Sequence, residues 1–599
     1  MKIKIDYERD ANFSEQSLKL LKDYYCTEEE KSPQDAFARA AIAYSYGDKK
    51  LAQSIYDAVS RGWFMYSSPV LSNAPKYREK AKALPISCFL AYVPDTLEGL
   101  IDHSSELRWL SVKGGGVGGH WSHVRSVSNK APGPIPFLRT VDADMTAYRQ
   151  GRTRRGSYAA YLDISHPDVG QFLEMRKPTG DPNIRCLNLH HGINITDDFM
   201  EIIQRCMADH EADDSWNLTD PKSGEIRDTV SAKELWQKIL ELRMMTGEPY
   251  LHFIDTSNRH MPQFQKDLGL KIHQSNLCSE IILPTDKKRT AVCCLSSVNL
   301  EYYDAWSKDP LFLKDMAEML DNVLQYFIEN APSTVKRAKY AAMRERSIGI
   351  GALGFHAYLQ RKGIAWESAV AKGLNMRVFK HIKNRLDTAN LELGIERGEA
   401  PDAAGTGRRF SHMQAIAPNA SSSIIMGNTS PSIEPWRANA YRQDTLSGSF
   451  LNKNKYLDAI VKAEAPNYKE GWYEDVWSSI IANDGSVQHL TWMSDITKEV
   501  YKTSMEIDQR WVIEHAADRQ KFIDQAQSLN LFFRPDANIK YLHAVHYLAW
   551  KQGLKTLYYC RSEKIGKADK VSKRIEREVI KEIDFKAMIE GDTCVACEG

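Results

Sequence analysis

The stretch Ile86-Ser-Cys-Phe-Leu-Ala-Tyr-Val93 indicates the fold class, because it is a short apolar run of the kind that forms a buried strand. Similar runs recur at Tyr158–Leu162, Gly192–Ile195 and Ala291–Leu295, with helical spacing between many of them. One helix is predicted to begin at Ser231-Ala-Lys-Glu234, which has the pattern of a capping box. Strands alternating with helices over most of the chain predict an α/β architecture.

The two ends of the chain differ from this middle part. Residues 13 to 62 have helical spacing, with Ser14 and Ser32 as predicted N-caps. From Arg561 onward charged residues dominate and aromatic residues nearly vanish. We therefore expect a helical region over residues 1–83, one large α/β unit over residues 84–560, and a flexible tail over residues 561–599.

Composition excludes several classes of protein. The 599 residues include 79 Lys and Arg against 78 Asp and Glu, so the net charge of +1 argues against a general nucleic-acid binder. Small ligands and protein partners are favoured instead. The sequence has no apolar run of membrane-spanning length, and its charged amino terminus is unlike a signal peptide. Ten cysteines are too sparse for a disulfide scaffold, which predicts a cytoplasmic protein with reduced thiols.

Two segments satisfy the glycine fingerprint of dinucleotide-binding proteins, Gly114–Gly119 and Gly349–Gly354. A nicotinamide dehydrogenase is therefore an alternative to keep. The fingerprint requires a preceding strand and a following helix, whereas a predicted helix precedes each segment. For the first segment we favour close backbone packing or the lining of a phosphate pocket.

The segment Ser275-Asn-Leu-Cys278-Ser-Glu280 places an amide, a thiol and a carboxylate at alternate positions. On a strand, Asn276, Cys278 and Glu280 would share one face. A single buried cysteine is usually a small hydrophobe, but these three side chains together are costly in a core unless they line a cavity. The pattern favours a catalytic site.

Other motifs are ambiguous taken singly. The pair Cys594 and Cys597 could be half of a zinc site, but it is better suited to thiol exchange on a mobile tail. The turn Pro418–Ser423 could bind a phosphate or simply cap a helix. Alone, Cys88, the tandem Cys293-Cys294 and the pair Tyr558-Tyr559 would each be interpreted as core packing.

Taken in order, these segments resemble the large catalytic subunit of a class I ribonucleotide reductase. The resemblance covers residues 67 to 599, and the ordered set is far more specific than any one motif. It rests on Ser68-Pro-Val-Leu-Ser-Asn73, Ser87-Cys-Phe-Leu90, Gly114–Gly119, Asn276–Glu280, Val292–Leu300, Arg346–Ala352, Pro418–Ser423, Ser432-Ile-Glu-Pro435, Leu557-Tyr-Tyr559 and the closing Cys-x-x-Cys.

The resemblance implies a ten-stranded α/β barrel of the ribonucleotide reductase and glycyl radical type, with Cys278 on a central finger loop. It assigns the thiyl radical to Cys278, the base to Glu280 and substrate hydrogen bonding to Asn276. It names Cys88 and Cys293 as the pair that is oxidised. Because Cys294 is adjacent, the spacing does not exclude Cys294 in place of Cys293.

The resemblance also implies how electrons and radicals arrive. Cys594 and Cys597 would reduce the buried pair again and be recharged by thioredoxin or glutaredoxin. Tyr558 and Tyr559 resemble the relay from a separate ferritin-like small subunit, whose metal cofactor supplies the radical. No metal or cofactor is expected to be bound permanently in this chain. An adenosylcobalamin-dependent reductase is the alternative within this chemistry.

Binding residues follow from the same resemblance. The substrate, a ribonucleoside diphosphate, is expected at Ser68, Ser87, Gly116, Asn419, Ala420, Ser421 and Ser422. A deoxynucleoside triphosphate or ATP effector, with Mg²⁺, is expected at Asp95, Thr96, Arg125 and Arg154, across a homodimer interface. No segment before the first motif resembles the family's ATP-binding cone, so we expect no inhibition by dATP at such a cone.

Overall fold

The computed structural model describes residues 1–76, 83–148, 157–445 and 448–562, and its main feature is a nine-stranded sheet. The strand order is β1-β9-β2-β3-β4-β5-β8-β14, and β10 pairs with β9. The strands are β1 Phe64–Tyr66, β2 Cys88–Tyr92, β3 Gly116–His120, β4 Ser157–Asp163, β5 His190–Ile195, β8 Tyr250–Phe253, β9 Ala291–Asn299, β10 Ile348–Leu353 and β14 Thr556–Leu557. All four apolar runs predicted as strands are strands.

The sheet consists of two groups of strands that meet at β2 and β9. Strands β2, β3, β4, β5 and β8 are parallel to one another. Strand β9 is parallel to β10 but antiparallel to β2. The α/β fold class is confirmed, with nine strands of the sheet assigned in the described ranges where the resemblance implied ten.

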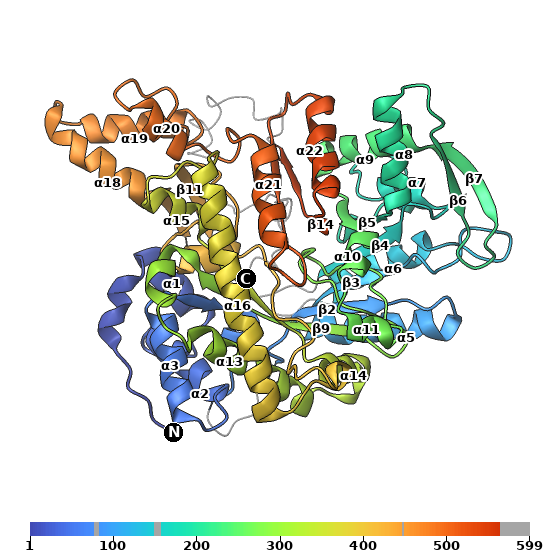
Figure 1. Cartoon of the computed structure of the whole chain (residues 1–599), viewed down its shortest axis with the longest axis horizontal. Coiled ribbons are helices and arrows are strands. Elements are labelled where there is room, and N and C mark those ends of the chain that lie inside the picture. The colour runs from blue at the N-terminus through green and yellow to red at the C-terminus, as the bar shows by residue number, and fades with distance from the viewer. Residues whose placement is uncertain (77–82, 149–156, 446–447, 563–599) are drawn as a thin grey trace.

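Helices cover the sheet and form most of the rest of the molecule (Figure 1). The predicted capping serine Ser231 accepts a hydrogen bond from the Glu234 amide at the start of α9. The longer helices are α5 Leu97–Val112, α6 Ile135–Ala147, α8 Asp197–Ala208, α9 Ala232–Thr246, α13 Phe312–Asn330, α14 Lys336–Glu345, α16 Ala369–Arg397, α21 Gln509–Gln520 and α22 Ile539–Lys551.

The amino-terminal region is helical, as predicted. It contains α1 Glu15–Tyr24, α2 Pro33–Ala43 and α3 Lys49–Ser60. Ser14 and Ser32 cap α1 and α2, and Ser32 forms a full capping box with Asp35. Helix α3 packs against α13, so this region is continuous with the main hydrophobic core.

A lobe with its own small core lies at the edge of the molecule, at the upper left in Figure 1. Leu457, Val461, Trp477 and Ile480 are buried in that core. The lobe contains β11 Ala440–Thr445, β12 Gly448–Lys453, α18 Lys455–Glu464, α19 Trp472–Ala482 and α20 Asp495–Val500.

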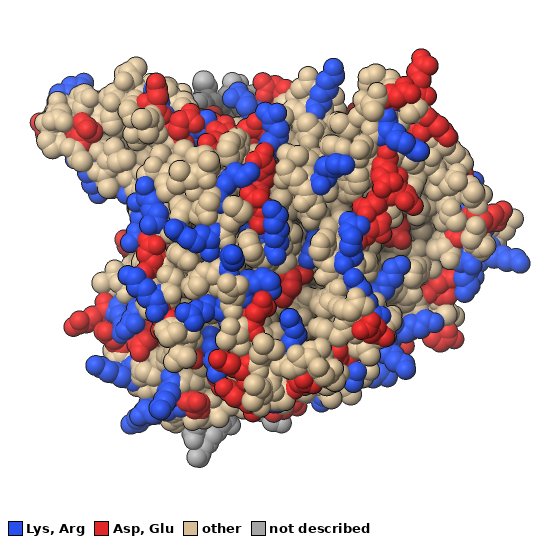
Figure 2. Space-filling model, viewed as in Figure 1, with Lys and Arg blue, Asp and Glu red and all other residues tan. Residues whose placement is uncertain are grey.

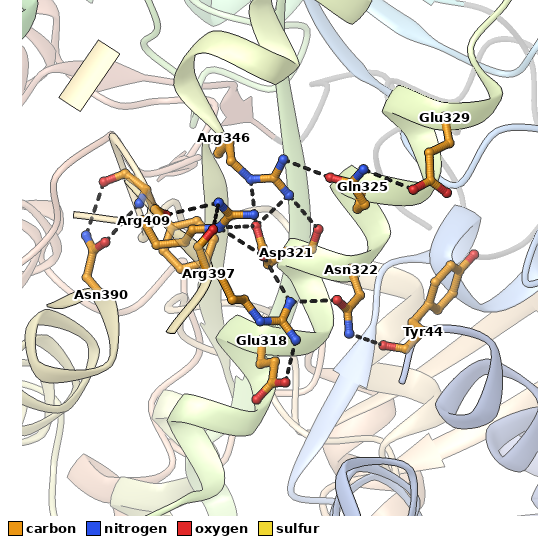
Figure 3. A network of polar contacts seen from close by, with 12 residues as sticks. Tyr44, Glu318, Asp321, Asn322, Gln325, Glu329, Arg346, Asn390, Arg397 and Arg409 are labelled. Carbon is orange, nitrogen blue, oxygen red and sulfur yellow. Dashed lines mark hydrogen bonds and ion pairs between the residues drawn. The ribbon is translucent and has the colours of Figure 1, made fainter. Parts of the chain in front are cut away.

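A buried ionic cluster ties three segments together around one carboxylate (Figure 3). Asp321 of α13 is 1% exposed and lies 2.7 Å from Arg346, 3.0 Å from Arg397 and 3.1 Å from Arg409. Arg346 is the C-cap of α14 just before β10, Arg397 ends α16, and Arg409 lies in the loop after α16. Removing one buried partner of such a cluster leaves uncompensated charge, so the cluster holds α13, α16 and β10 in one arrangement.

Both glycine segments lie mainly in strands. Gly116, Gly118 and Gly119 are part of β3, and Gly349 and Gly351 are part of β10. Helices α5 and α14 precede them, as expected. No helix follows β3 directly, and in the second segment Gly349 and Gly351 lie inside β10, so that Gly354 alone is at the turn into α15 Phe355–Arg361. Neither segment therefore forms a glycine-rich turn on which a dinucleotide's pyrophosphate could lie, which removes the basis for the dehydrogenase alternative.

The surface in Figure 2 shows blue and red side chains interspersed over the visible face, as the near-zero net charge suggests. In the described part of the chain, no helix is long and apolar enough to cross a membrane.

Candidate functional site

Asn276, Cys278 and Glu280 lie in a buried loop rather than on a strand, in agreement with the central loop on which the resemblance places Cys278. Residues 277 to 279 form a turn in which Ser279 has φ +65°, a left-handed conformation that no extended strand contains. All three side chains are about 1% exposed or less. Their convergence therefore depends on the turn and its packing rather than on strand alternation.

The loop can lie against β3 because that strand has glycines. A Cβ atom at Gly118 would lie 2.1 Å from the Ser275 carbonyl oxygen, and one at Gly116 would lie 2.7 Å from Leu277 Cδ2. From β4, the Tyr161 hydroxyl donates to the Asn276 carbonyl at 2.7 Å. Close backbone approach, one of the two functions expected of these glycines, is what the structure shows.

Cys278 lies against an aromatic cluster. The Tyr558 hydroxyl lies 3.5 Å from the Cys278 sulfur. The rings of Tyr558 and Tyr559 have centroids 4.3 Å apart, and Tyr250 of β8 lies 4.7 Å from the first and 5.1 Å from the second. The adjacent tyrosines therefore form a continuous contact that ends at the Cys278 sulfur.

The polar atoms around this sulfur come from the same loop and one further segment. The Ser528 hydroxyl contacts both the Cys278 carbonyl and the Glu280 carboxyl, the latter at 3.1 Å. Asn276 Oδ1 accepts the Ile281 amide at 3.1 Å, whereas its buried Nδ2 has no partner among the described residues. Since buried donors are normally satisfied, this amide is suited to bind a ligand.

Cys88 and Cys293 are brought together by the sheet. They are direct partners in the antiparallel register of β2 and β9. Gln525 Nε2 lies 3.5 Å from the Cys293 sulfur, and burial raises the pKa of this thiol well above its usual value. Cys294 is packed in the main hydrophobic core, whereas Cys88 and Cys293 share a separate cluster. Alternation along β9 therefore separates the two adjacent cysteines.

One cavity connects several of the predicted residues. Its lining includes Ser87, Cys88, Glu280 and Asn419, together with Ser67 and Ser297. The predicted Ser68 does not line it, because its hydroxyl lies 2.8 Å from the Tyr25 hydroxyl. Gly116 lies next to the cavity wall, and its amide donates to the Ser87 carbonyl at 2.6 Å.

The turn at Pro418 leads into a helix, α17 Ala420–Ile425. Asn419 precedes it with φ +55° and makes no side-chain cap. Its side chain instead accepts from Ser297 at 3.1 Å and donates to the carbonyls of Ala352 and Ala417. The alternative of an ordinary side-chain N-cap at Asn419 is therefore not observed. Ser421 and Ser422 lie in the first turn of α17.

The predicted effector residues lie together at the start of α5. Arg125 Nε lies 2.9 Å from an Asp95 carboxylate oxygen, and the Thr96 hydroxyl caps α5 by accepting the Gly99 amide at 3.0 Å. Arg154, Cys594 and Cys597 lie outside the described residues.

Sequence reasoning missed several residues that the structure brings to this site. Ser67 directly precedes Ser68, the first residue of one of the motifs, so the motif already pointed to this part of the chain. Ser528, Gln525 and Tyr250 lie in segments without a motif, and only the tertiary structure places them near the cysteines. Among the described residues, no group of three or more His, Cys, Asp or Glu is arranged to hold a metal ion.

Comparisons with known proteins agree on one family. The chain matches the ribonucleotide reductase barrel domain over residues 86–406 and 401–560, and the ribonucleotide reductase all-alpha domain over residues 11–79.

Individual relatives match over nearly the whole chain. It is 50% identical to the ribonucleoside-diphosphate reductase large subunit of Invertebrate iridescent virus 3, over 95% of this chain and 97% of the relative. It is also 50% identical to the putative large subunit of Frog virus 3, over 94% and 95% respectively. The class Id ribonucleotide reductase alpha subunit of Actinobacillus ureae superposes with a TM-score of 0.80 at 32% identity, covering 94% of this chain and 99% of that one.

Proposed function

The chain belongs to the ribonucleotide reductase large-subunit family, and on that premise we propose that it reduces ribonucleoside diphosphates to 2′-deoxyribonucleoside diphosphates by radical chemistry begun at Cys278. One observation carries the proposal: the Tyr558 hydroxyl lies 3.5 Å from the Cys278 sulfur, inside the barrel. The product class supplies precursors for DNA.

The loop residues divide the first step between them. A thiyl radical at Cys278 takes the 3′-hydrogen of the ribose, while Glu280 accepts the proton of the 3′-hydroxyl. The buried Nδ2 of Asn276 donates a hydrogen bond to the substrate, which supplies the acceptor that the described residues do not. After reduction, Cys278 returns a hydrogen atom to C3′ and the thiyl radical is formed again.

Loss of the 2′-hydroxyl as water consumes two electrons and protons. Cys88 and Cys293 provide them and become a disulfide. Their position as cross-strand partners of one antiparallel pair supports this role. Because the pair is buried, an external protein cannot reach it directly. We propose that Cys594 and Cys597 reduce it by thiol exchange and are themselves reduced by thioredoxin or glutaredoxin.

The radical enters through the adjacent tyrosines. A large subunit of this family implies a small-subunit partner, and we propose a ferritin-like one whose metal cofactor generates the radical. The contact of Tyr559 with Tyr558, and of Tyr558 with Cys278, supports a path in that order.

We propose that the substrate diphosphate is bound by Ser87, Asn419, Ala420, Ser421 and Ser422, with Ser67 in the position first expected of Ser68. The uncapped start of α17 supports this because backbone amides there can receive an anion.

Effector binding is proposed at Asp95, Thr96, Arg125 and Arg154, with Mg²⁺ on the effector phosphates. A homodimer formed through α5 agrees with the exposure of Leu97, Ile101, Trp109 and Val112 on that helix, which are 69%, 59%, 45% and 41% exposed. Residues 11–79 match the all-alpha domain of the family rather than a cone. We therefore propose that effectors select which substrate is reduced, and that dATP does not inhibit the enzyme by binding to a cone.

The decisive experiment is turnover of CDP by the purified chain with dithiothreitol, Mg²⁺ and an effector. Added ferritin-like subunit is compared with added adenosylcobalamin, and Cys278→Ser is the control. We expect turnover that requires the protein subunit and is lost in the variant. Turnover with adenosylcobalamin alone would contradict the tyrosine path, and activity with neither addition would contradict the proposed reaction.

A further inference from the structure

A second cavity lies outside the site described above. Its volume is about 640 Å³, within the size range of small-molecule sites. It is formed by one side of α5, the turn at residues 286–289 and the start of α14. The residues that line it are Asp102, Ser105, Glu106, Lys287, Lys288, Ser333, Thr334, Lys336, Arg337 and Tyr340.

The charges that line this cavity are predominantly positive. Arg337 is neutralised by Glu106 at 2.6 Å, and Glu106 also accepts from Thr290. Lys287, Lys288 and Lys336 form no ion pair with any described residue. Asp102 is the one remaining carboxylate of the lining. Two positive charges are therefore in excess, in a concave place where they reinforce one another.

The backbone contributes to the same electrostatic field. A short 3₁₀ turn, Ser333–Val335, leads into the ten-residue helix α14, and neither has a side-chain cap at its start. Uncapped amides at a helix start favour anions. The hydroxyls of Ser333 and Thr334 line the cavity beside them. Donors and positive charges thus come from three separate segments.

The segments are held by buried ion pairs rather than by the lysines. Arg289, next to Lys288, pairs with Asp402 and lies 3.2 Å from Glu345 at the other end of α14. Its guanidinium also lies 5.5 Å from the ring of Tyr340, which is 41% exposed at the cavity. The turn and the helix are therefore fixed in place before any ligand arrives, which lowers the entropic cost of binding.

We propose that this cavity is a binding site for a small molecule that carries an oligophosphate group. Phosphate oxygens match the three unpaired ammonium groups, the hydroxyls and the uncapped amides. The exposed ring of Tyr340 offers a stacking surface if the oligophosphate belongs to a nucleotide. The site is distinct from Asp95 and Arg125 and shares no residue with the cavity at Cys88, so it does not depend on the proposed reaction.

The test is calorimetric titration of the full chain with inorganic tripolyphosphate, and separately with ATP, at low salt. The pocket variant carries Lys287→Ala, Lys288→Ala and Lys336→Ala. The matched control removes three exposed lysines elsewhere, with Lys308→Ala, Lys380→Ala and Lys540→Ala. Arg125→Ala separates this site from the proposed effector site.

We expect tripolyphosphate to bind the wild-type chain, the control variant and Arg125→Ala alike, and the pocket variant at least ten-fold more weakly. If ATP binds more tightly than tripolyphosphate and Tyr340→Ala removes this preference, the source of the phosphate is a nucleotide. If the two bind equally, the ligand is an oligophosphate alone. Equal weakening in the pocket and control variants, or no tripolyphosphate binding at millimolar concentration, would overturn the proposal. So would ATP binding that only Arg125→Ala removes.

Discussion

Cys88 lies directly opposite Cys293 across the antiparallel pair of β2 and β9. Opposite residues in such a pair have Cβ atoms about 4.5–5.5 Å apart, so a small shift brings the sulfurs to bonding distance. Cys294 is the neighbour of Cys293 in sequence, yet it packs in a different cluster. The register of one pair of strands therefore selects which cysteine can act.

We predict that Cys293→Ser lowers CDP turnover by about a thousandfold or more, because the reducing pair acts as a unit. Cys294→Ala should retain most of the turnover. Turnover is measured with the partner subunit and dithiothreitol. Peptide mapping after a single turnover should find a Cys88–Cys293 disulfide, and a disulfide to Cys294 instead would refute the register argument.

We predict that Tyr558→Phe abolishes turnover while substrate affinity changes little. The substitution removes only the hydroxyl that lies 3.5 Å from the Cys278 sulfur and keeps the ring that packs on Tyr250. Equilibrium binding of CDP, measured beside turnover, separates the two effects. Appreciable turnover by this variant would mean that the radical reaches Cys278 by another route.

Gly118→Ala should displace the loop that carries Cys278. The new methyl group would lie 2.1 Å from the Ser275 carbonyl, so the loop must move. Overpacking of this kind costs about 1–3 kcal/mol of stability. Turnover should fall by more than the loss of folded protein accounts for. Urea unfolding and turnover are measured together.

The matched control is Gly373→Ala in α16, where nothing lies within 4 Å of the new Cβ atom. It should stabilise the chain by about 0.5–1 kcal/mol, because alanine is the better helix former. If both variants behave alike, close packing at β3 does not position the loop.

A histidine cluster next to the loop predicts acid sensitivity. His120, His123 and His273 have ring centroids 4.6 to 5.3 Å apart, and burial lowers the pKa of each, that of His273 to about 4. The unfolded pKa is about 6.5. Above that pH the contribution to stability is fully present, and it is lost as pH falls toward 4, because the unfolded chain binds protons more readily.

The urea concentration at the unfolding midpoint should therefore decrease as the pH is lowered from 7 to 5. In His273→Gln this decrease should be smaller. His210→Gln, at an exposed position, is the control. An unchanged pH dependence in His273→Gln would show that the cluster does not set the acid limit.

Arg243 is predicted to position the tyrosines. This buried residue donates to the Tyr558 carbonyl at 3.0 Å and to the Pro249 carbonyl, and its Nε donates to His546 Nε2 at 2.9 Å. Arg243→Met should lower turnover more than tenfold without changing CDP affinity, and Arg243→Lys should restore part of it. If the two variants lose turnover only in proportion to lost folded protein, Arg243 is structural and nothing more.

The sequence by itself determined the class of the fold and named most of the residues to which we propose chemical roles. Apolar runs such as Ile86–Val93 become strands because burial of both faces is a local property of composition. The caps at Ser14, Ser32 and Ser231 were also predictable, since capping depends on residues within one turn. The ordered motifs led to the proposal of Cys278, Glu280 and the tyrosine pair for the same reason, because each of these motifs lies within one short segment.

Only the tertiary structure decided how these segments meet. The residues from Asn276 to Glu280 form a loop with a turn, because Ser279 adopts φ +65° and the glycines of β3 admit the loop. The alternate spacing of the three polar residues would put them on one face only if they lay on a strand. Ser67 rather than Ser68 lines the cavity, and Cys293 rather than Cys294 lies opposite Cys88, because the helix start and the strand register orient them. Such choices depend on contacts between residues hundreds of positions apart, and no local pattern encodes which of two neighbours such a contact will select.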